Sequence, residues 1–276
     1  MSEKFQNYIG LEETKIKNET DAFLESIKRK GFFLKESLFT DYEIDTLRLK
    51  IDEIWEKQVK EFGHEFLVSI NEIGSVRCMM SYEKLFLDLV RDPKIFNFIE
   101  AAIGDTAILH LQNGIILSPS ANHNQSQYHK DFPKNFVSDS LLSLNSLIVI
   151  DEFNQETGGT FYIEGSHIFK EKPSDLYIEQ NEIQINAKPG DVLFFDSMLW
   201  HKGGSNKTNK PRRAINQQYT KPFIKQQISY PDLMQGKVDI DTPLAQTLGM
   251  WTIPPKSLLE YRVDDSSKRT YRGGQG

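Results

Sequence analysis

Two histidines and one aspartate are the residues most able to bind a metal. His129 and Asp131 are separated by one residue, and His201 follows after a distant apolar run. In a strand, residues i and i+2 share a face, so His129 and Asp131 can converge while Lys130 points elsewhere. Two imidazoles and one carboxylate on one side of ferrous iron leave its other positions open. A His-x-Asp triplet alone is common and can be merely structural, so the distant histidine matters.

An arginine pair follows the last of these residues. Arg212 stands eleven residues after His201, and Arg213 is its neighbour. A planar guanidinium can bind a carboxylate through two parallel hydrogen bonds. Arg212 is therefore a candidate to hold the far end of a dicarboxylic co-substrate, and the alternative is a solvated charge at a strand end. Strand alternation should turn only one of the two arginines inward, which leaves a one-residue ambiguity.

Helical patterns dominate the first hundred residues. Thr40 and Glu43 form a capping-box signature, and apolar residues recur behind it at helical spacing. Gly31 should end an earlier helix and lead into a short strand. Helices are expected at about 22–30, 41–61, 83–91 and 93–103.

From residue 106 the sequence favours short strands separated by Gly and Pro turns. Such punctuation is typical of a sandwich or jelly roll. We expect one domain over 1–276, mainly β with flanking helices. Its parts would be a helical section (1–105), a jelly-roll core (106–222), a cover on the substrate side (223–262) and a mobile tail (263–276). The expected strands are 107–117, 142–153, 160–163, 183–187, 192–195 and 214–220.

Bulk properties exclude several classes of protein. The net charge is −6 and the pI is about 5.6, which argues against broad binding to nucleic acid. No apolar run is long enough to span a membrane, and the first residues do not resemble a signal peptide. The single cysteine, Cys78, cannot form an internal disulfide and is expected to pack beside Met79. A reducing cytoplasm is the expected location.

Four segments in order resemble the phytanoyl-CoA dioxygenase (PhyH) family, which includes the ectoine hydroxylases. The N-terminal Gly31-Phe32-Phe33 also matches the family's usual opening, and the resemblance covers roughly residues 30–222. The four segments are Tyr128–Phe132, Gly158–His167, Pro189–Phe195 and His201–Ile215.

The resemblance implies a double-stranded β-helix, a cupin-like jelly roll, with an iron site near its open end. It implies that His129, Asp131 and His201 bind iron, and that Arg212 pairs with the 5-carboxylate of 2-oxoglutarate. Gln112 matches a pocket glutamine of ectoine hydroxylases, although a strand amide satisfied by backbone is an equal alternative. The sequence departs from the family at Gly203, where many relatives have a serine that assists the co-substrate.

The implied activity is that of a dioxygenase that uses Fe(II), 2-oxoglutarate and O₂. We expect it to hydroxylate an unactivated C–H bond of a small polar metabolite, with release of succinate and CO₂. Asp131 favours hydroxylation over halogenation, because related halogenases have a small residue in its place. Desaturation, epimerisation or ring formation remain open, as does a non-catalytic binding module.

The substrate itself is not readable from the sequence, and neither is the oligomeric state. Residues close to the triad in sequence are candidates to contact the substrate. They are Phe132, Lys134, Trp200 and Gln217, with Lys130 as a further cation that could meet an anionic group.

Overall fold

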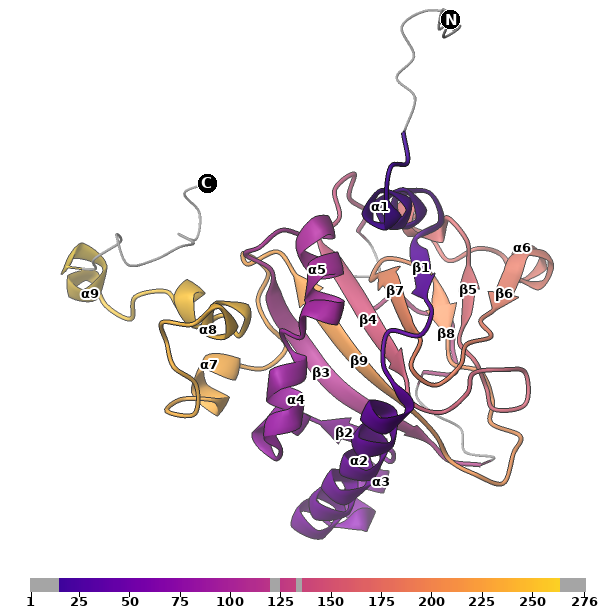
Figure 1. The fold of residues 1–276 in the computed structure, drawn as a ribbon, viewed down its shortest axis with the longest axis horizontal. Helices are drawn as coiled ribbons and strands as arrows, with labels where there is room; N and C mark the ends of the chain where they lie inside the picture. The colour runs from indigo at the N-terminus through magenta and orange to yellow at the C-terminus, as the bar shows by residue number, and fades with distance from the viewer. Residues whose placement is uncertain (1–14, 120–124, 133–135, 264–276) are drawn as a thin grey trace, which may run out of the picture.

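Two antiparallel sheets form the centre of the protein (Figure 1). The computed structural model describes residues 15–119, 125–132 and 136–263. The large sheet has the order β1-β7-β4-β9-β3-β2, and the small sheet has the order β6-β5-β8. The strands are β1 (Phe32–Lys35), β2 (Ser75–Arg77), β3 (Ile108–Leu117), β4 (Ser143–Val149), β5 (Phe161–Ile163), β6 (Glu182–Gln184), β7 (Val192–Asp196), β8 (His201–Lys202) and β9 (Arg212–Thr220).

Helices cover the face of the large sheet that lies away from the small sheet. Figure 1 shows α5 across this face, with α1 above it and α2 below. Short helices near the C-terminus lie beyond the β3 side of the sheet. The helices are α1 (Glu19–Lys30), α2 (Asp41–Phe62), α3 (His64–Ser69), η1 (Met79–Ser81), α4 (Lys84–Leu89), α5 (Pro93–Ala102), η2 (Ser166–Ile168), α6 (Asp175–Asn181), α7 (Tyr230–Leu233), α8 (Pro243–Thr247), η3 (Met250–Thr252) and α9 (Leu258–Val263).

Helix boundaries follow from local chemistry. Thr40 and Glu43 form the expected capping box at the start of α2, so two otherwise unpaired backbone amides are satisfied. Gly31 ends α1 in the left-handed region, with φ of 85°. An added Cβ there would lie 2.6 Å from Leu199 Cδ1, so glycine is required for two reasons.

Strand alternation divides the interior into two cores. On β7, Val192 and Phe194 pack in the cluster shared with the helices, whereas Leu193 and Phe195 pack between the two sheets. Successive strand residues point to opposite faces, and this sheet buries both. The same alternation decides which side chains of β3, β4 and β9 reach the space between the sheets.

The mainly β prediction with flanking helices and a cupin-like jelly-roll core is confirmed. The sequence prediction did not include α3, β2, α6, β8, α7, α8 or α9, each of which is short. The mobile-tail prediction falls on residues outside the described part, apart from Val263 at the end of α9. Along the described chain, none of the helices combines the length and apolarity needed to cross a membrane.

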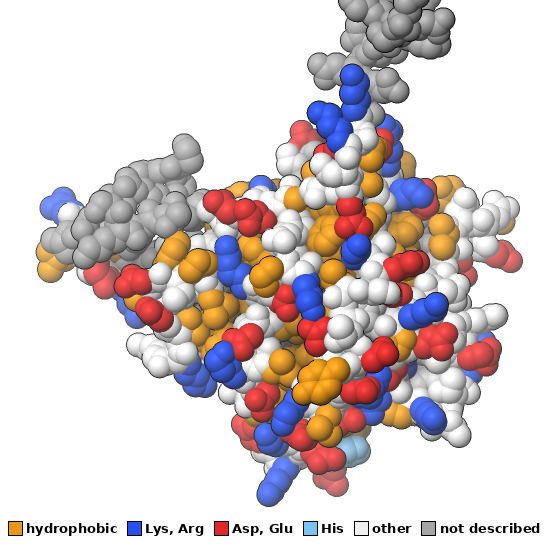
Figure 2. All heavy atoms as spheres, in the orientation of Figure 1, with side chains coloured by type: hydrophobic (Ala, Val, Ile, Leu, Met, Phe, Trp, Pro, Cys, Tyr) orange, Lys and Arg blue, Asp and Glu red, His pale blue; other side chains and the backbone are white. Residues whose placement is uncertain are grey.

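Charged side chains of both signs are mixed over the face that Figure 2 shows. Lys and Arg neighbour Asp and Glu there, and apolar side chains fill the gaps between them. The ion pairs Lys84–Asp88 and Arg48–Asp151 belong to this kind of mixed surface. This face therefore carries no extended basic stripe of the type that follows a phosphate backbone.

Candidate metal centre and co-substrate cavity

Backbone pairing joins the two histidines of the candidate triad. His129 and His201 form an isolated antiparallel bridge, with N–H to carbonyl distances of 2.9 and 3.0 Å. His201 begins β8 and is paired with Tyr162 of β5. The Asp131 amide donates to the Ser197 carbonyl at 3.0 Å, which fixes the third residue. Segments distant in sequence are therefore held together by main-chain hydrogen bonds.

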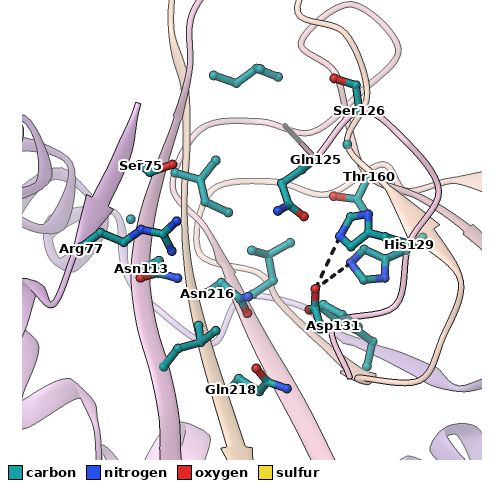
Figure 3. Close-up of a pocket in the computed structure, with 18 of the residues that line it drawn as sticks. Ser75, Arg77, Asn113, Gln125, Ser126, His129, Asp131, Thr160, Asn216 and Gln218 are labelled. Carbon is teal, nitrogen blue, oxygen red and sulfur yellow. Dashed lines mark ion pairs between the residues drawn. The ribbon is translucent and has the colours of Figure 1, made fainter. Parts of the chain in front are cut away.

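The three side chains converge on one point (Figure 3). Asp131 Oδ1 lies 3.4 Å from His129 Nε2 and 3.7 Å from His201 Nε2. One potential ligand atom from each residue lies within 4.8 Å of the others. Among the described residues, this is the group of His, Cys, Asp or Glu side chains that could hold a metal ion.

The tautomers suit a metal. His129 Nδ1 lies 2.7 Å from the Gln127 carbonyl, and His201 Nδ1 lies 2.9 Å from the Leu199 carbonyl. A carbonyl only accepts, so each Nδ1 carries the proton and each Nε2 presents its lone pair to the cluster. Burial lowers the pKa of His201 and keeps its ring neutral, as a metal ligand must be. This donor set fits ferrous iron.

The carboxylate of Asp131 is held ionised. Burial raises its pKa, but the two imidazoles and a hydrogen bond from Asn145 together lower it below the usual value. Asn145 Nδ2 donates to Oδ2 at 2.7 Å, and Ser197 Oγ donates to Asn145 Oδ1. Oδ1 therefore remains directed toward the imidazoles.

A cavity of about 240 Å³ opens beside the triad. Figure 3 shows Gln125 and Thr160 close to His129, with Arg77 and Asn113 on the opposite wall. The lining combines neutral polar side chains with apolar ones, among them Leu147 and Phe195. Gly203 also lines the cavity. Gly203 itself contributes no hydroxyl, although Thr160 and Ser126 line the same cavity.

The two arginines point in opposite directions. Arg212 is 4% exposed and lines the cavity, with its guanidinium 4.4 Å from the Phe153 ring centroid. Nη2 donates to the Gly158 carbonyl at 3.0 Å, and Nε has no partner among the described residues. Burial lowers the pKa of Arg212 to about 10, so the side chain is still cationic at neutral pH.

Arg213 faces the helices and is fully engaged there. It makes two hydrogen bonds to Asp52, at 2.7 and 2.8 Å, and one to Asp151 at 2.9 Å. Its role is to join α2 to the sheet. Of the pair, Arg212 has the position expected for a carboxylate anchor.

The structure corrects the expectation that Gln112 lines the co-substrate site. Its side chain is fully buried on the helical face of β3, where Nε2 donates to Phe86 and Gln217, and Oε1 accepts from Met80 N. All its polar atoms are satisfied there, as in the structural alternative. Gln217 is corrected for the same reason, because it lies on the helical face of β9 beside Gln112.

Two further substrate candidates also point away from the cavity. Trp200 packs with Ile163 and Ile178 in a separate apolar cluster. Lys130 lies 5.3 Å above the Trp200 ring and donates to the Phe169 carbonyl, so it does not face the triad. Lys130 points away because side chains alternate in direction along this extended segment, so it lies opposite His129 and Asp131.

The remaining candidates have mixed outcomes. The Phe132 ring lies 6.3 Å from the ring of His110, a cavity residue, but Phe132 is not itself part of the lining. Lys134 lies outside the described residues. From the segment 223–262, Gln227 is the described residue that lines the cavity, whereas Tyr230 and Leu248 pack into the helical core.

Several cavity residues were not predicted from the sequence. They come mostly from β3 and β9. Strand alternation along β9 from Arg212 would have indicated Asn216 and Gln218. The residues that were not predicted are Arg77, His110, Asn113, Gln125, Asn216, Gln218 and Gln227.

A jelly roll with a His-Asp-His cluster beside an arginine-lined cavity defines the class of Fe(II)/2-oxoglutarate-dependent dioxygenases. This chain belongs to the phytanoyl-CoA dioxygenase (PhyH) family, whose profile matches residues 27–214. It is thus an enzyme that uses Fe(II), 2-oxoglutarate and O₂.

Individual relatives match most of the chain. An uncharacterized protein of Mycobacterium tuberculosis is 34% identical over 271 residues, which cover 95% of this chain and 98% of the relative. An ectoine dioxygenase of Bordetella bronchiseptica is 24% identical over 223 residues, which cover 70% of this chain and 72% of the relative.

Two solved structures share the fold. The S. alaskensis EctD structure, with 2-oxoglutarate and 5-hydroxyectoine, has a TM-score of 0.62 and 19% identity, over 72% of this chain and 74% of EctD. The α-ketoglutarate-dependent epimerase SnoN from nogalamycin biosynthesis has a TM-score of 0.56 and 16% identity, over 74% of this chain and 83% of SnoN.

Proposed function

We propose that this dioxygenase hydroxylates an unactivated C–H bond of a small polar metabolite, with release of succinate and CO₂. The observation that carries the proposal is the cavity of about 240 Å³, which adjoins both the triad and Arg212 and is lined by neutral polar side chains as well as apolar ones. A concave space with a few convergent polar groups suits a small molecule. A cytoplasmic location stays a prediction.

Three residues would hold the iron in this proposal. His129 and His201 would bind through Nε2, and Asp131 through the Oδ1 atom that faces them. Bound iron, with 2-oxoglutarate and O₂, supplies the oxidising chemistry. The protein's part is to orient both imidazoles through hydrogen bonds at Nδ1, to keep His201 neutral by burial and to hold Asp131 ionised.

Arg212 would bind the distal carboxylate of 2-oxoglutarate. Its position among buried apolar groups strengthens a charge-assisted hydrogen bond, since the local dielectric is low. The unpartnered Nε offers a donor for this purpose. Phe153 beneath the guanidinium and Leu147 nearby limit access of water.

The first test is binding of the two cofactors. Fe(II) and 2-oxoglutarate, added without oxygen, should together raise the melting temperature, because they bind the native state. His129→Ala should abolish substrate-coupled succinate release and this shift, while the cofactor-free melting temperature stays close to that of the wild type. A wild-type chain with no shift and no bound iron would contradict the proposal.

The mass of the product then decides the reaction outcome. Hydroxylation adds one oxygen atom, desaturation or ring formation removes two hydrogen atoms, and epimerisation leaves the mass unchanged. Identification of any product other than a hydroxylated one would replace the proposed reaction with one of these alternatives.

A further inference from the structure

A β-bulge directs one histidine into the cavity. On β3, Leu109 pairs with Tyr219 and Leu111 pairs with Gln218, so His110 is an extra residue in the ladder. Leu109 packs into the helical core, while both His110 and Leu111 line the cavity. Bulges of this kind re-aim a side chain next to an active site. The bulge places His110 next to Gln218 on the neighbouring strand.

Gln218 presents an unmet hydrogen-bond acceptor to this cavity. The residue is fully buried, and its Nε2 donates to Ser143 Oγ at 2.8 Å and to Ser197 Oγ at 3.1 Å. Its Oε1 has no partner among the described residues. A buried carbonyl oxygen without a donor destabilises the protein, so a ligand that supplies the donor would be favoured.

Proton positions fix this orientation of the amide. Ser197 gives its one hydroxyl proton to Asn145 Oδ1, because the Asn145 amide nitrogen faces Asp131. The contact of 2.7 Å between Ser143 Oγ and Ser197 Oγ therefore requires the proton of Ser143. Neither serine has a proton left for Gln218, so its nitrogen faces them and its oxygen faces the cavity.

His110 presents a second acceptor. Its Nδ1 is buried and has no partner among the described residues, while the backbone of Lys225 hydrogen-bonds the ring. Burial lowers the pKa of His110, so the ring is neutral at physiological pH. A neutral imidazole with a bare Nδ1 accepts a hydrogen bond and does not attract an anion.

Each charged side chain that lines the cavity has either a partner or an assigned role in cofactor binding. Arg212 would serve the co-substrate and Asp131 the metal, and Arg77 is paired with Glu72. The other described lining residues with polar side chains are neutral, and Asp131 is the single carboxylate among the described lining residues. An ammonium group would therefore find no free counter-charge, whereas hydroxyl groups match amide and hydroxyl side chains. These neutral residues include Ser75, Asn113, Asn216 and Gln227.

We propose that His110 and Gln218 form a substrate subsite that accepts hydrogen bonds from hydroxyl groups of a neutral, polyol- or sugar-like substrate. This inference rests on the proposed function, because it assigns Arg212 and the triad to the cofactors. It narrows the substrate from a polar metabolite to one that carries at least two O–H donors near the oxidised carbon.

Calorimetry on the full chain, loaded with Fe(II) and 2-oxoglutarate without oxygen, tests the subsite. The probes are glycerol, myo-inositol and the methyl α-pyranosides of glucose, galactose and mannose, each with its fully O-methylated counterpart. Glucosamine is the cationic probe. We expect at least one free-hydroxyl probe to bind at least tenfold more tightly than its O-methylated form and more tightly than glucosamine.

Variants of His110 and Gln218 test whether these two residues bind the probe. His110→Phe and Gln218→Met should each lower the affinity for that probe at least tenfold. The affinity for Fe(II) and 2-oxoglutarate should stay within about twofold of the wild-type value. Tyr219→Phe is the matched control, because Tyr219 neighbours Gln218 but faces the helices, where its hydroxyl binds the Val90 carbonyl. It should leave probe binding unchanged.

The outcomes are distinct. Equal binding of hydroxylated and O-methylated probes, a preference for glucosamine, unchanged binding in both variants, or no probe binding to a cofactor-loaded chain would each overturn the subsite. A chain that fails to bind Fe(II) and 2-oxoglutarate would instead overturn the proposed function, and the subsite with it.

Discussion

Asn145 Nδ2 lies 2.7 Å from Asp131 Oδ2, the carboxylate oxygen directed away from the two imidazoles. Because the ionised carboxylate can only accept, Asn145 turns its Nδ2 toward Asp131 and its Oδ1 toward Ser197. The candidate metal ligand is thereby aimed by a residue that does not itself touch the metal position. Partners of this kind tune metal affinity.

Asn145→Leu should weaken Fe(II) binding about ten- to a hundredfold, because Asp131 loses the donor that orients it. Anaerobic titration with Fe(II) measures this. Ser146→Ala is the control, since Ser146 is the next residue on β4 and its side chain bonds the Gln217 carbonyl. Wild-type iron affinity in the leucine variant would contradict the orienting role.

Replacement of the two arginines should separate binding from stability. Arg212→Met should raise the KM for 2-oxoglutarate about ten- to a hundredfold, because a charge-assisted pair is lost. Arg213→Met should leave that KM unchanged and lower the free energy of unfolding by about 1–3 kcal/mol, because Asp52 and Asp151 lose their partner. Steady-state kinetics and urea unfolding measure the two effects, and the reverse pattern would mean that the register is misassigned.

Two adjacent glycines should differ in tolerance. A Cβ on Gly203 would lie 3.4 Å from the nearest backbone oxygen, whereas one on Gly204 would lie 2.5 Å from Gly159 O and 2.8 Å from Gly158 C. Gly204→Ala should therefore lower the free energy of unfolding by about 1–3 kcal/mol. It should also weaken the binding of 2-oxoglutarate, because Gly158 O orients Arg212.

Thermal unfolding and 2-oxoglutarate titration of both alanine variants test this difference. Gly203→Ala serves as the matched control and should remain near wild type in both measurements. A Gly204→Ala variant with wild-type stability would show that the turn has room to relax.

Acid should remove one stabilising contribution at the start of α2. Hydrogen bonds from Lys94 and from the Thr40 backbone lower the pKa of Glu43 from 4.5 to about 2. A depressed pKa stabilises the folded state above the unfolded pKa, and this contribution is lost as the pH falls from about 4.5 toward 2.

Glu43→Gln should therefore be less stable than wild type at about pH 6, and the difference should shrink at about pH 3. Urea unfolding at the two pH values measures it. A difference that stays constant with pH would exclude the ionised carboxylate as its source.

The sequence predicted the elements well where local chemistry defines them. The capping box at Thr40 and the stop at Gly31 depend on neighbouring residues, and both occur as expected. Similarly, His129 and Asp131 stand two apart, so a shared direction follows from strand geometry alone. Their approach to His201 was expected through the family resemblance.

The substrate-side predictions depended on information that is not local. Gln112 was expected from the family resemblance and Gln217 from its closeness to the site in sequence, but each is one residue out of phase with the cavity face. A shift of one residue exchanges the two faces of a strand, so proximity in sequence says little without the register. The bulge at His110 adds a second shift on β3 that no residue pattern signals.

The paired main-chain hydrogen bonds between His129 and His201 affect how the protein responds to loss of iron. In small zinc-binding domains the ion creates the fold, and its removal unfolds the chain. Here the peptide backbone already holds both imidazoles side by side. Loss of iron would therefore leave a folded but inactive protein that regains activity when iron returns. Iron supply would then set the fraction of active molecules rather than the amount of folded protein.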